Sequence, residues 1–327
     1  MTVPFVYQRA ESVEDAVVRL AEPRTLPMGG GTDLLVTIDE GIYAPAAVVD
    51  LRAVPASDSV ELREDGTLRM GASARIEHLA NHPLIRERYG ALAEACSVVA
   101  TPALREMGTL GGNLCQRPRC WYFRLEEVNC LKKGGSECYA AKGENKYNAI
   151  IGGGPSYIVH PSDLAPMLLA LGATVTVMGA AGKRVIPLDK FFTLPSEGNI
   201  RRENVLKNEE IITEIQVPAS PLAARSTYLK FKERESLDFA LASAAVAVRL
   251  SGRTVQDARI VLGGVAPVPW RVPAAEKFLV GKELKPDVLA EAGKIALADA
   301  RPLEKNAYKV PLAQTLVRRA LAKAGGV

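Results

Sequence analysis

The sequence predicts an α+β fold made of two β/α units followed by a C-terminal domain with an antiparallel sheet. The first reason is length, because 327 residues are more than one hydrophobic core usually organises. The second is composition: 48% hydrophobic and 24% charged residues, without low-complexity runs, are typical of a folded globular chain. The third is a shift of composition near residue 220, after which three strand patterns follow one another.

The first unit is predicted over residues 1–55. Residues 10–22 are typical of an amphipathic helix, with Ser12 as the candidate N-cap and apolar residues at helical spacing. Three glycines at 29–31 then lead into a second helix-like segment. Residues 46–51, "AAVVDL", have the β-branched content of a short buried strand. Together these segments predict a compact β/α unit.

The second unit is predicted over residues 56–218. Residues 60–73 are typical of a polar hairpin, and residues 83–100 of a long helical stretch. Residues 160–188 predict a helix followed by another hairpin. A cysteine-rich segment at about 115–150 separates these patterns, so we interpret it as an insertion in an otherwise continuous unit.

The C-terminal domain is predicted over residues 223–327. Residues 214–224, "EIQVPASPLAA", have the prolines, alanines and serine of a linker. Three antiparallel strands follow, and then two helices at about 284–299 and 311–324.

Charge and sorting signals narrow the classes of function. The 41 basic and 37 acidic residues are scattered together, so the net charge of +4 does not form a nucleic-acid surface. The N-terminus carries no export signal and no run approaches the roughly 18 apolar residues of a membrane span. We therefore expect a cytoplasmic protein, with co-export alongside a signal-bearing partner as the alternative. In a reducing compartment, clustered cysteines are more often ligands than disulfides.

Two glycine loops are candidates for binding phosphate. "MGGGTDLL" at 28–35 and "TLGGNL" at 109–114 offer backbone amides that no side chain blocks. Neither matches the spacing of the dinucleotide fingerprint or the P-loop, so each alone is also consistent with a simple turn. Two such loops in one chain favour a ligand with two phosphates.

The cysteine-rich segment is a candidate metal site, with the spacing Cys115-x4-Cys120-x9-Cys130-x7-Cys138. Zinc sites usually show paired cysteine knuckles, whereas iron–sulfur sites accept looser spacing. Lys132 and the neighbouring Lys133 would offset the charge of a thiolate-bound cluster. Four reduced structural thiols are the alternative without a metal.

The motifs of the chain resemble those of a known family. "GGGTDLL", "ATPALREMGTLGGNL", "HPSDLAPMLLALGA" and "FKERESLDFALASAAVAV" are similar, in order and spacing, to the FAD-binding subunit of the molybdenum hydroxylases, the xanthine dehydrogenase and carbon monoxide dehydrogenase superfamily. The resemblance covers nearly the whole chain. It implies a two-part FAD-binding domain of the vanillyl-alcohol-oxidase type and a CO-dehydrogenase-flavoprotein-like C-terminal domain.

The resemblance also implies cofactor contacts. Both glycine loops would hold the FAD pyrophosphate, Asp163 would contact the cofactor, and Lys232 would lie beside the flavin. Asp163 could instead cap a helix together with Ser162, and Lys232 could lie on a solvated strand face. The loop residues that inherit this role are Met28, Gly29, Gly30, Gly31, Thr32, Asp33, Leu34, Thr109, Gly111, Gly112 and Asn113.

The insertion resembles those of the 4-hydroxybenzoyl-CoA reductase β subunit and the flavin subunit of bacterial periplasmic aldehyde oxidoreductases. These relatives bind an extra 4Fe-4S cluster there, which implies that Cys120, Cys130 and Cys138 are ligands. The fourth ligand of the relatives falls at Tyr147 in one and at Ser156 in the other, and neither is a cysteine here. Cys115 is then the first candidate for the fourth ligand, with the oxygen of Ser156 or an open site as alternatives.

The function implied is electron transfer without a catalytic side chain of its own. The chain would hold FAD and a 4Fe-4S cluster as the medium subunit of a three-subunit enzyme. Its partners would be a large molybdopterin subunit and a small subunit with two 2Fe-2S clusters, with a dimer of such trimers as an open alternative. A stand-alone FAD oxidase and a zinc-stabilised scaffold protein are the rival interpretations. The organic substrate is not encoded in this chain.

Overall fold

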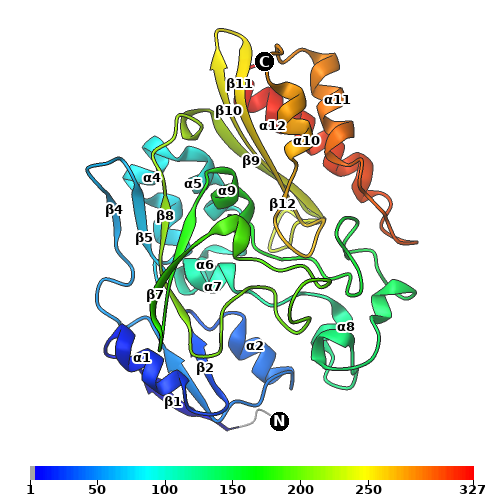
Figure 1. The fold of residues 1–327 in the computed structure, drawn as a ribbon. Helices are drawn as coiled ribbons and strands as arrows, with labels where there is room; N and C mark the ends of the chain where they lie inside the picture. The colour runs from blue at the N-terminus through cyan, green and yellow to red at the C-terminus, as the bar shows by residue number, and fades with distance from the viewer. Residues whose placement is uncertain (1–3) are drawn as a thin grey trace.

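The computed structural model describes residues 4–327 and shows three sheets stacked along the long axis of the molecule, with the N-terminal sheet at one end (Figure 1). The N-terminal sheet is parallel, in the order β1-β3-β2. Its elements are β1 (Val6–Arg9), α1 (Val13–Leu20), β2 (Thr25–Met28), α2 (Leu34–Asp39) and β3 (Ala47–Asp50).

The predicted first helix and buried strand are both confirmed. Ser12 is the N-cap of α1, and its Oγ accepts a hydrogen bond of 3.0 Å from the backbone N–H of Asp15. The apolar side of α1 is buried, as the helical spacing predicts. All four residues of β3 are buried because this strand lies between the other two.

The middle sheet is antiparallel and has the order β4-β5-β8-β6-β7, so both predicted hairpins are present. The predicted helical stretch at 83–100 is broken at Tyr89, where ψ is 46° and the N–H bonds back to the carbonyl of Ile85. The strands are β4 (Val60–Leu62), β5 (Leu68–Gly71), β6 (Thr174–Gly179), β7 (Gly182–Pro187) and β8 (Ile211–Val217). The helices are α3 (Ile76–Asn81), α4 (Pro83–Arg88), α5 (Gly90–Ser97), α6 (Pro102–Met107), α7 (Leu110–Leu114) and α9 (Leu164–Ala170).

The cysteine-rich segment, residues 115–150, leaves the core directly after α7 and extends to one side of the molecule (Figure 1). It contains the short helix α8 (Trp121–Arg124) and two single 3₁₀ turns, Leu131–Lys133 and Tyr139–Ala141. Most of it is irregular, so its shape depends on side-chain contacts with the rest of the chain.

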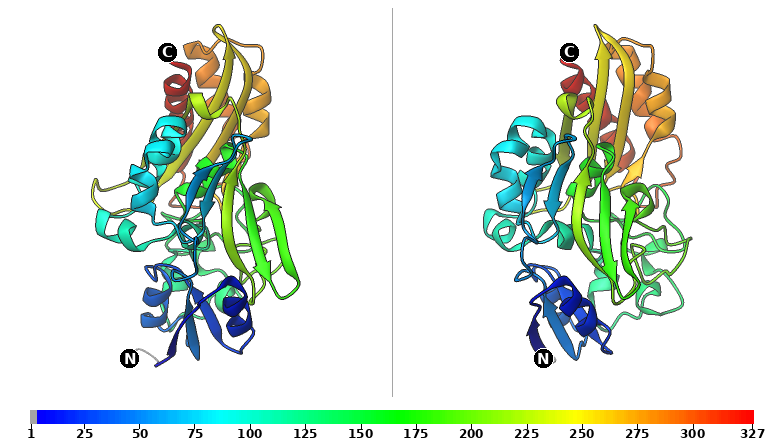
Figure 2. Two further views of the ribbon diagram at one scale, coloured as in Figure 1. Left: turned by 90° about the vertical axis from the view of Figure 1, so that its left-hand side faces the viewer. Right: turned by 60° about the vertical axis from the view of Figure 1, so that its left-hand side comes forward.

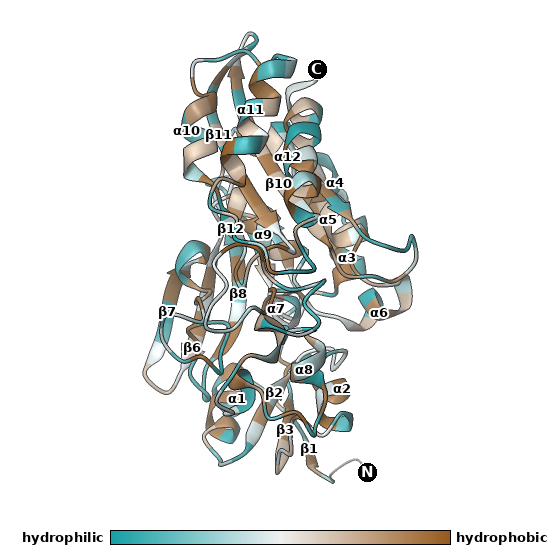
Figure 3. Cartoon of the chain, turned by 90° about the vertical axis from the view of Figure 1, so that its right-hand side faces the viewer, coloured by the Kyte–Doolittle hydropathy of each residue, from teal (hydrophilic) through white to brown (hydrophobic). Residues whose placement is uncertain are grey.

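The C-terminal sheet is antiparallel, in the order β12-β11-β10-β9, and confirms the predicted α+β class. Its central strand β10 is buried from Ala242 to Val248, because helices cover both faces of the sheet (Figures 2 and 3). In this domain, the sequence patterns did not predict the short helix α10 or the two-residue strand β12. The elements are β9 (Ser226–Phe231), β10 (Ala242–Ser251), β11 (Thr254–Gly263), β12 (Trp270–Arg271), α10 (Pro273–Leu279), α11 (Pro286–Ala296) and α12 (Lys309–Gly325).

A buried lysine joins the C-terminal domain to the end of the cysteine-rich segment. Lys309 is 1% exposed, and its Nζ donates to the carbonyls of Tyr147 at 2.8 Å and Gly264 at 2.9 Å. Burial lowers the pKa of Lys309 to about 7. No helix within residues 4–327 is long and apolar enough to cross a membrane.

The stability of the chain should depend on pH through Lys309. The pKa of Lys309 is lower in the folded chain than in the unfolded chain. Between about pH 7 and pH 10, Lys309 is therefore protonated to a greater extent in the unfolded chain. The free energy of unfolding of the wild type, minus that of Lys309→Met, should therefore rise through this window by up to about 1.4 kcal/mol per pH unit. Denaturant unfolding at pH 6, 7, 8 and 9 measures it.

The matched control is Lys294→Met, whose side chain is 69% exposed on α11. The difference in free energy of unfolding between the wild type and Lys294→Met should not change over the same pH range. If the difference for Lys309→Met does not change either, Lys309 does not have a lowered pKa in the folded chain.

Candidate cofactor-binding site

The two glycine loops are packed directly against each other. A Cβ on Gly30 would lie 1.6 Å from the carbonyl oxygen of Met107, and one on Gly29 would lie 2.4 Å from Oγ1 of Thr109. Gly31 has a φ of +74°, a conformation that favours glycine. Glycine is therefore required in the first loop, because of close contacts at Gly29 and Gly30 and because of the positive φ at Gly31. The second loop packs directly against the first.

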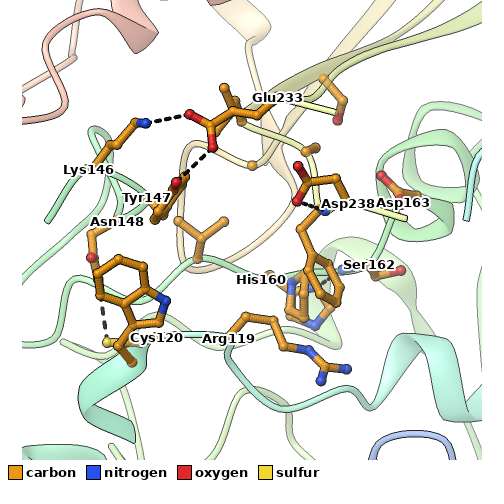
Figure 4. Close-up of a pocket in the computed structure, with 18 of the residues that line it drawn as sticks. Arg119, Cys120, Lys146, Tyr147, Asn148, His160, Ser162, Asp163, Glu233 and Asp238 are labelled. Atoms are coloured by element: carbon orange, nitrogen blue, oxygen red, sulfur yellow. Dashed lines mark hydrogen bonds and ion pairs between the residues drawn. The ribbon is translucent and has the colours of Figure 1, made fainter. Parts of the chain in front are cut away.

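A cavity of about 380 Å³ opens where the loops meet, and it is lined by residues 29–34 and by Thr109, Gly112 and Asn113. A second cavity of about 500 Å³ lies between the cysteine-rich segment and the C-terminal domain (Figure 4). The two cavities form one cleft because they share lining residues, namely Arg119, Pro161, Asp163, Asp238 and Phe239.

The second loop is held by short polar contacts. Thr109 caps α7, with Oγ1 accepting from the N–H of Gly112 at 3.2 Å. Asn113 is buried, and its Oδ1 accepts a hydrogen bond of 2.5 Å from the hydroxyl of Ser162. The same hydroxyl accepts from the N–H of Ala165 at 3.0 Å. The hydroxyl of Ser162 therefore caps the N-terminus of α9 and also fixes the orientation of the Asn113 side chain.

The carboxylate of Asp33 faces the cysteine-rich segment. It accepts hydrogen bonds from the backbone N–H of Arg117 and from Nη2 of Arg124, both at 2.7 Å, and forms an ion pair of 3.0 Å with Arg119. Arg119 also stacks over the ring of Phe239, with its guanidinium 4.7 Å from the ring centroid. The sequence placed Asp33 in the first loop without indicating that its carboxylate ties the insertion to that loop.

Asp163 lines both cavities, and its side chain makes no cap hydrogen bond. Ser162 provides the cap instead. The carboxylate of Asp163 accepts from Nζ of Lys230 at 2.7 Å and from the hydroxyl of Tyr228 at 2.8 Å. Both donors come from β9, and the sequence analysis named neither of them.

Lys232 lies just beyond the end of β9. Its Nζ donates to the backbone carbonyls of Glu235 and Ser236, and its side chain is not among those that line either cavity. The structure therefore separates Lys232 from Asp163 and brings Lys230 to this carboxylate instead.

His160 lines the second cavity, where Figure 4 shows its ring close to Ser162. Burial lowers the pKa of His160 to about 4, so the ring is neutral at physiological pH. Its Nδ1 accepts from the N–H of Ser162 at 3.3 Å, and its ring packs edge-on against Phe192. These contacts give His160 a structural role.

The five cysteines are free thiols: Cys96 and Cys130 are buried, and Cys115, Cys120 and Cys138 are half-buried. Cys96 lies on α5 with its side chain in the core, and it lines neither cavity. Cys115 lines the loop cavity next to Asn204, whose Nδ2 lies 3.8 Å from the sulfur, and burial raises the pKa of this thiol to about 12. Cys120 lines the second cavity and contacts Nδ2 of Asn148 at 3.7 Å.

The structure does not gather the predicted cluster ligands around a common position. Burial is the main cause that raises the pKa of the Cys120 thiol. Within residues 4–327, no three His, Cys, Asp or Glu side chains surround a common metal position. The four-cysteine set stays a prediction.

Lys132 does not face solvent or a free thiolate. It is 3% exposed, and its Nζ forms an ion pair of 2.5 Å with Glu203 and donates to the carbonyl of Arg202 at 3.0 Å. Glu203 also pairs with Nε of Arg117 at 2.8 Å. These buried contacts attach the cysteine-rich segment to residues 202–203.

Asp33→Ala should loosen the insertion, because its carboxylate receives three donors from residues 117–124. We expect faster hydrogen–deuterium exchange of amides 115–125, with exchange in α12 unchanged. Asp58→Ala, at an exposed carboxylate, is the control and should leave both segments unchanged. Equal exchange in the two variants would show that Asp33 does not hold the insertion.

Comparison with known proteins identifies the family to which this chain belongs. Residues 3–220 match the FAD binding domain in molybdopterin dehydrogenase, and residues 226–324 match the CO dehydrogenase flavoprotein C-terminal domain. The aldehyde oxidoreductase FAD-binding subunit PaoB of Escherichia coli (strain K12) is 33% identical over 98% of both chains. The carbon monoxide dehydrogenase medium chain of Hydrogenophaga pseudoflava is 29% identical over 97% of this chain and 96% of its own.

A solved structure agrees along the whole chain. Carbon monoxide dehydrogenase from Hydrogenophaga pseudoflava, in a form that lacks the Mo-pyranopterin moiety of the molybdenum cofactor, superposes with a TM-score of 0.78 and 27% identity. The match covers 100% of this chain and 99% of that one. These findings confirm the resemblance seen in the motifs: the chain belongs to the FAD-binding medium subunits of the molybdenum hydroxylase family.

Proposed function

We propose that this chain binds FAD across the cleft and transfers electrons as the medium subunit of a three-subunit molybdenum enzyme. The observation that carries the proposal is the meeting of two glycine loops at one cavity, in a chain whose family binds FAD. The partners are a large molybdopterin subunit and a small iron–sulfur subunit, as implied by the family. A dimer of such trimers is part of the proposal.

The residues of the cleft fit the cofactor. The glycines of the first loop carry no side chain, so their backbone can approach a pyrophosphate closely. Arg117 and Arg119 line the same cavity and are held there by ion pairs with Glu203 and Asp33. The cleft continues past Asp163 into the second cavity, so it suits an elongated ligand with a charged middle and a planar end.

Each part of the chain has a binding role in this proposal. Residues 29–34 and Thr109, Gly112 and Asn113, which line the loop cavity, hold the pyrophosphate, while Asp163 accepts a hydrogen bond from the cofactor. Met28 and Gly111 belong to the same loops but are buried and do not line the cavity, so their role is to shape the loops. When bound, FAD supplies the exchange between one-electron and two-electron partners. The protein fixes its position and excludes water, so none of its side chains has to act as a catalytic acid or base.

Gly112 gives the clearest test of the loops. It is exposed, and a Cβ there would meet within 4 Å only Oγ1 of Thr109, at 2.9 Å. Gly30 is a poorer probe because a side chain would strike the protein backbone itself. Gly112→Val should therefore fold and lose FAD, by about a hundredfold in affinity or more if a phosphate contact is lost.

Fluorescence titration of the flavin-free protein with FAD measures the loss, and circular dichroism checks folding. Gly90→Val is the matched control: it is also a helical glycine, and a Cβ there meets nothing within 4 Å. It should bind FAD like the wild type. Unchanged affinity in Gly112→Val would refute the loop assignment.

We further propose that the insertion carries a 4Fe-4S cluster. Cys120, Cys130 and Cys138 are the ligands in this proposal, which is supported by the family resemblance of the insertion. Asn148 Nδ2 is placed to donate to the Cys120 sulfur, a contact that commonly tunes such clusters. Cys115 is the proposed fourth ligand, with Ser156 as the alternative.

Iron content separates these assignments. After anaerobic purification, Cys120→Ala should lose the cluster while Cys96→Ala, at the buried core thiol, keeps it. Cys115→Ala and Ser156→Ala then distinguish the two candidates for the fourth ligand. Iron per flavin and electron paramagnetic resonance of the reduced protein are the measurements. A wild-type chain with flavin and no iron would contradict the cluster and leave the FAD proposal standing.

A further inference from the structure

A buried triad crosses the junction between the FAD-binding part and the C-terminal domain. Asp163 lies at the start of α9, while Tyr228 and Lys230 lie two residues apart on β9 and therefore point to the same side of that strand. The side chain of Lys230 is 3% exposed and that of Asp163 is 6% exposed. The triad is thus shielded from solvent on the protein side and borders the cleft through Asp163.

The triad holds the carboxylate in one orientation. Oδ2 of Asp163 accepts from Lys230 at 2.7 Å, and Oδ1 accepts from the Tyr228 hydroxyl at 2.8 Å. Lys230 also donates to the carbonyl of Val98 at 3.1 Å, which fixes its own position. Each carboxylate oxygen can accept more than one hydrogen bond, so Asp163 keeps acceptor capacity for a ligand in the cleft.

The strand that carries the donors is itself fixed. The backbone N–H of Tyr228 donates to Oε2 of Glu94 at 3.3 Å, and the hydroxyl of Thr227 reaches the same oxygen at 3.2 Å. Glu94 belongs to α5 of the FAD-binding part. The position of Asp163 therefore depends on how the C-terminal domain docks.

We propose that Lys230, assisted by Tyr228, is a positioning residue that holds the Asp163 carboxylate in the orientation that faces FAD in the cleft. This inference rests on the proposed FAD site. Removing Lys230 leaves a buried carboxylate without its counter-charge, which costs much more than losing an exposed pair. The C-terminal domain thereby contributes to cofactor affinity through a residue that does not touch the cofactor.

The experiment measures the FAD dissociation constant of the full-length, flavin-free chain by fluorescence titration. Lys230→Met should weaken binding about ten- to hundredfold, the range expected for a hydrogen bond to a charged group. Lys294→Met, at an exposed lysine of α11 that lines neither cavity, is the control and should stay within about twofold. Lys230→Arg keeps the charge and should recover most of the affinity. Tyr228→Phe removes only the hydroxyl oxygen, so this variant should fold. Its loss of FAD affinity should be smaller than that of Lys230→Met.

A double-variant comparison separates positioning from a purely structural role. In the Asp163→Asn background, Lys230→Met should add less than about twofold, because the carboxylate on which Lys230 acts is absent. A loss as large as that in the wild-type background would overturn the inference. So would equal FAD affinities of Lys230→Met and the Lys294→Met control. A wild-type chain that takes up no FAD would overturn the proposed function and this inference with it, which distinguishes the two failures.

Discussion

The direct contact between the two glycine loops is the constraint on which the rest of the site depends. No side chain fits at Gly30, because the carbonyl of Met107 occupies the place of its Cβ. This contact brings Asp33, at the end of the first loop, next to the start of the insertion that follows the second loop. A substitution at Gly30 would therefore disturb the loops, the insertion and the cavity together, whereas a Cβ on Gly112 meets only the Thr109 hydroxyl, which has to shift to make room.

The cleft is built by three parts of the chain that are distant in sequence. The N-terminal unit supplies the first loop, the middle unit the second loop and Asp163, and the C-terminal domain the donors that orient Asp163. The insertion adds Arg119, which stacks on Phe239 of the C-terminal domain. Such an arrangement suits a subunit that holds a redox cofactor still, because its task is position and environment rather than acid or base catalysis.

The sequence predicts features that depend on neighbouring residues, such as helix caps and hairpins. It does not predict features that depend on contacts between residues distant in the chain. The Ser12 cap, the hairpins and the antiparallel strands of the C-terminal domain follow from short-range patterns, and the structure confirms them. The break at Tyr89 is different, since a continuous helical pattern gives no sign of it. The same holds for the charges: no spacing shows that Asp33 receives arginines from 84 and 91 residues away. Likewise, Lys230 and Lys232 look alike in sequence, and only the end of β9 separates them.

The identity of the bound flavin tests the central claim most directly, because the two glycine loops are proposed to hold a pyrophosphate that FAD contains and FMN lacks. The chain, produced with its partner subunits, would be denatured and the released cofactor identified by mass spectrometry. The account predicts FAD at about one per chain, with no FMN. Release of FMN, or a protein without flavin, would contradict it.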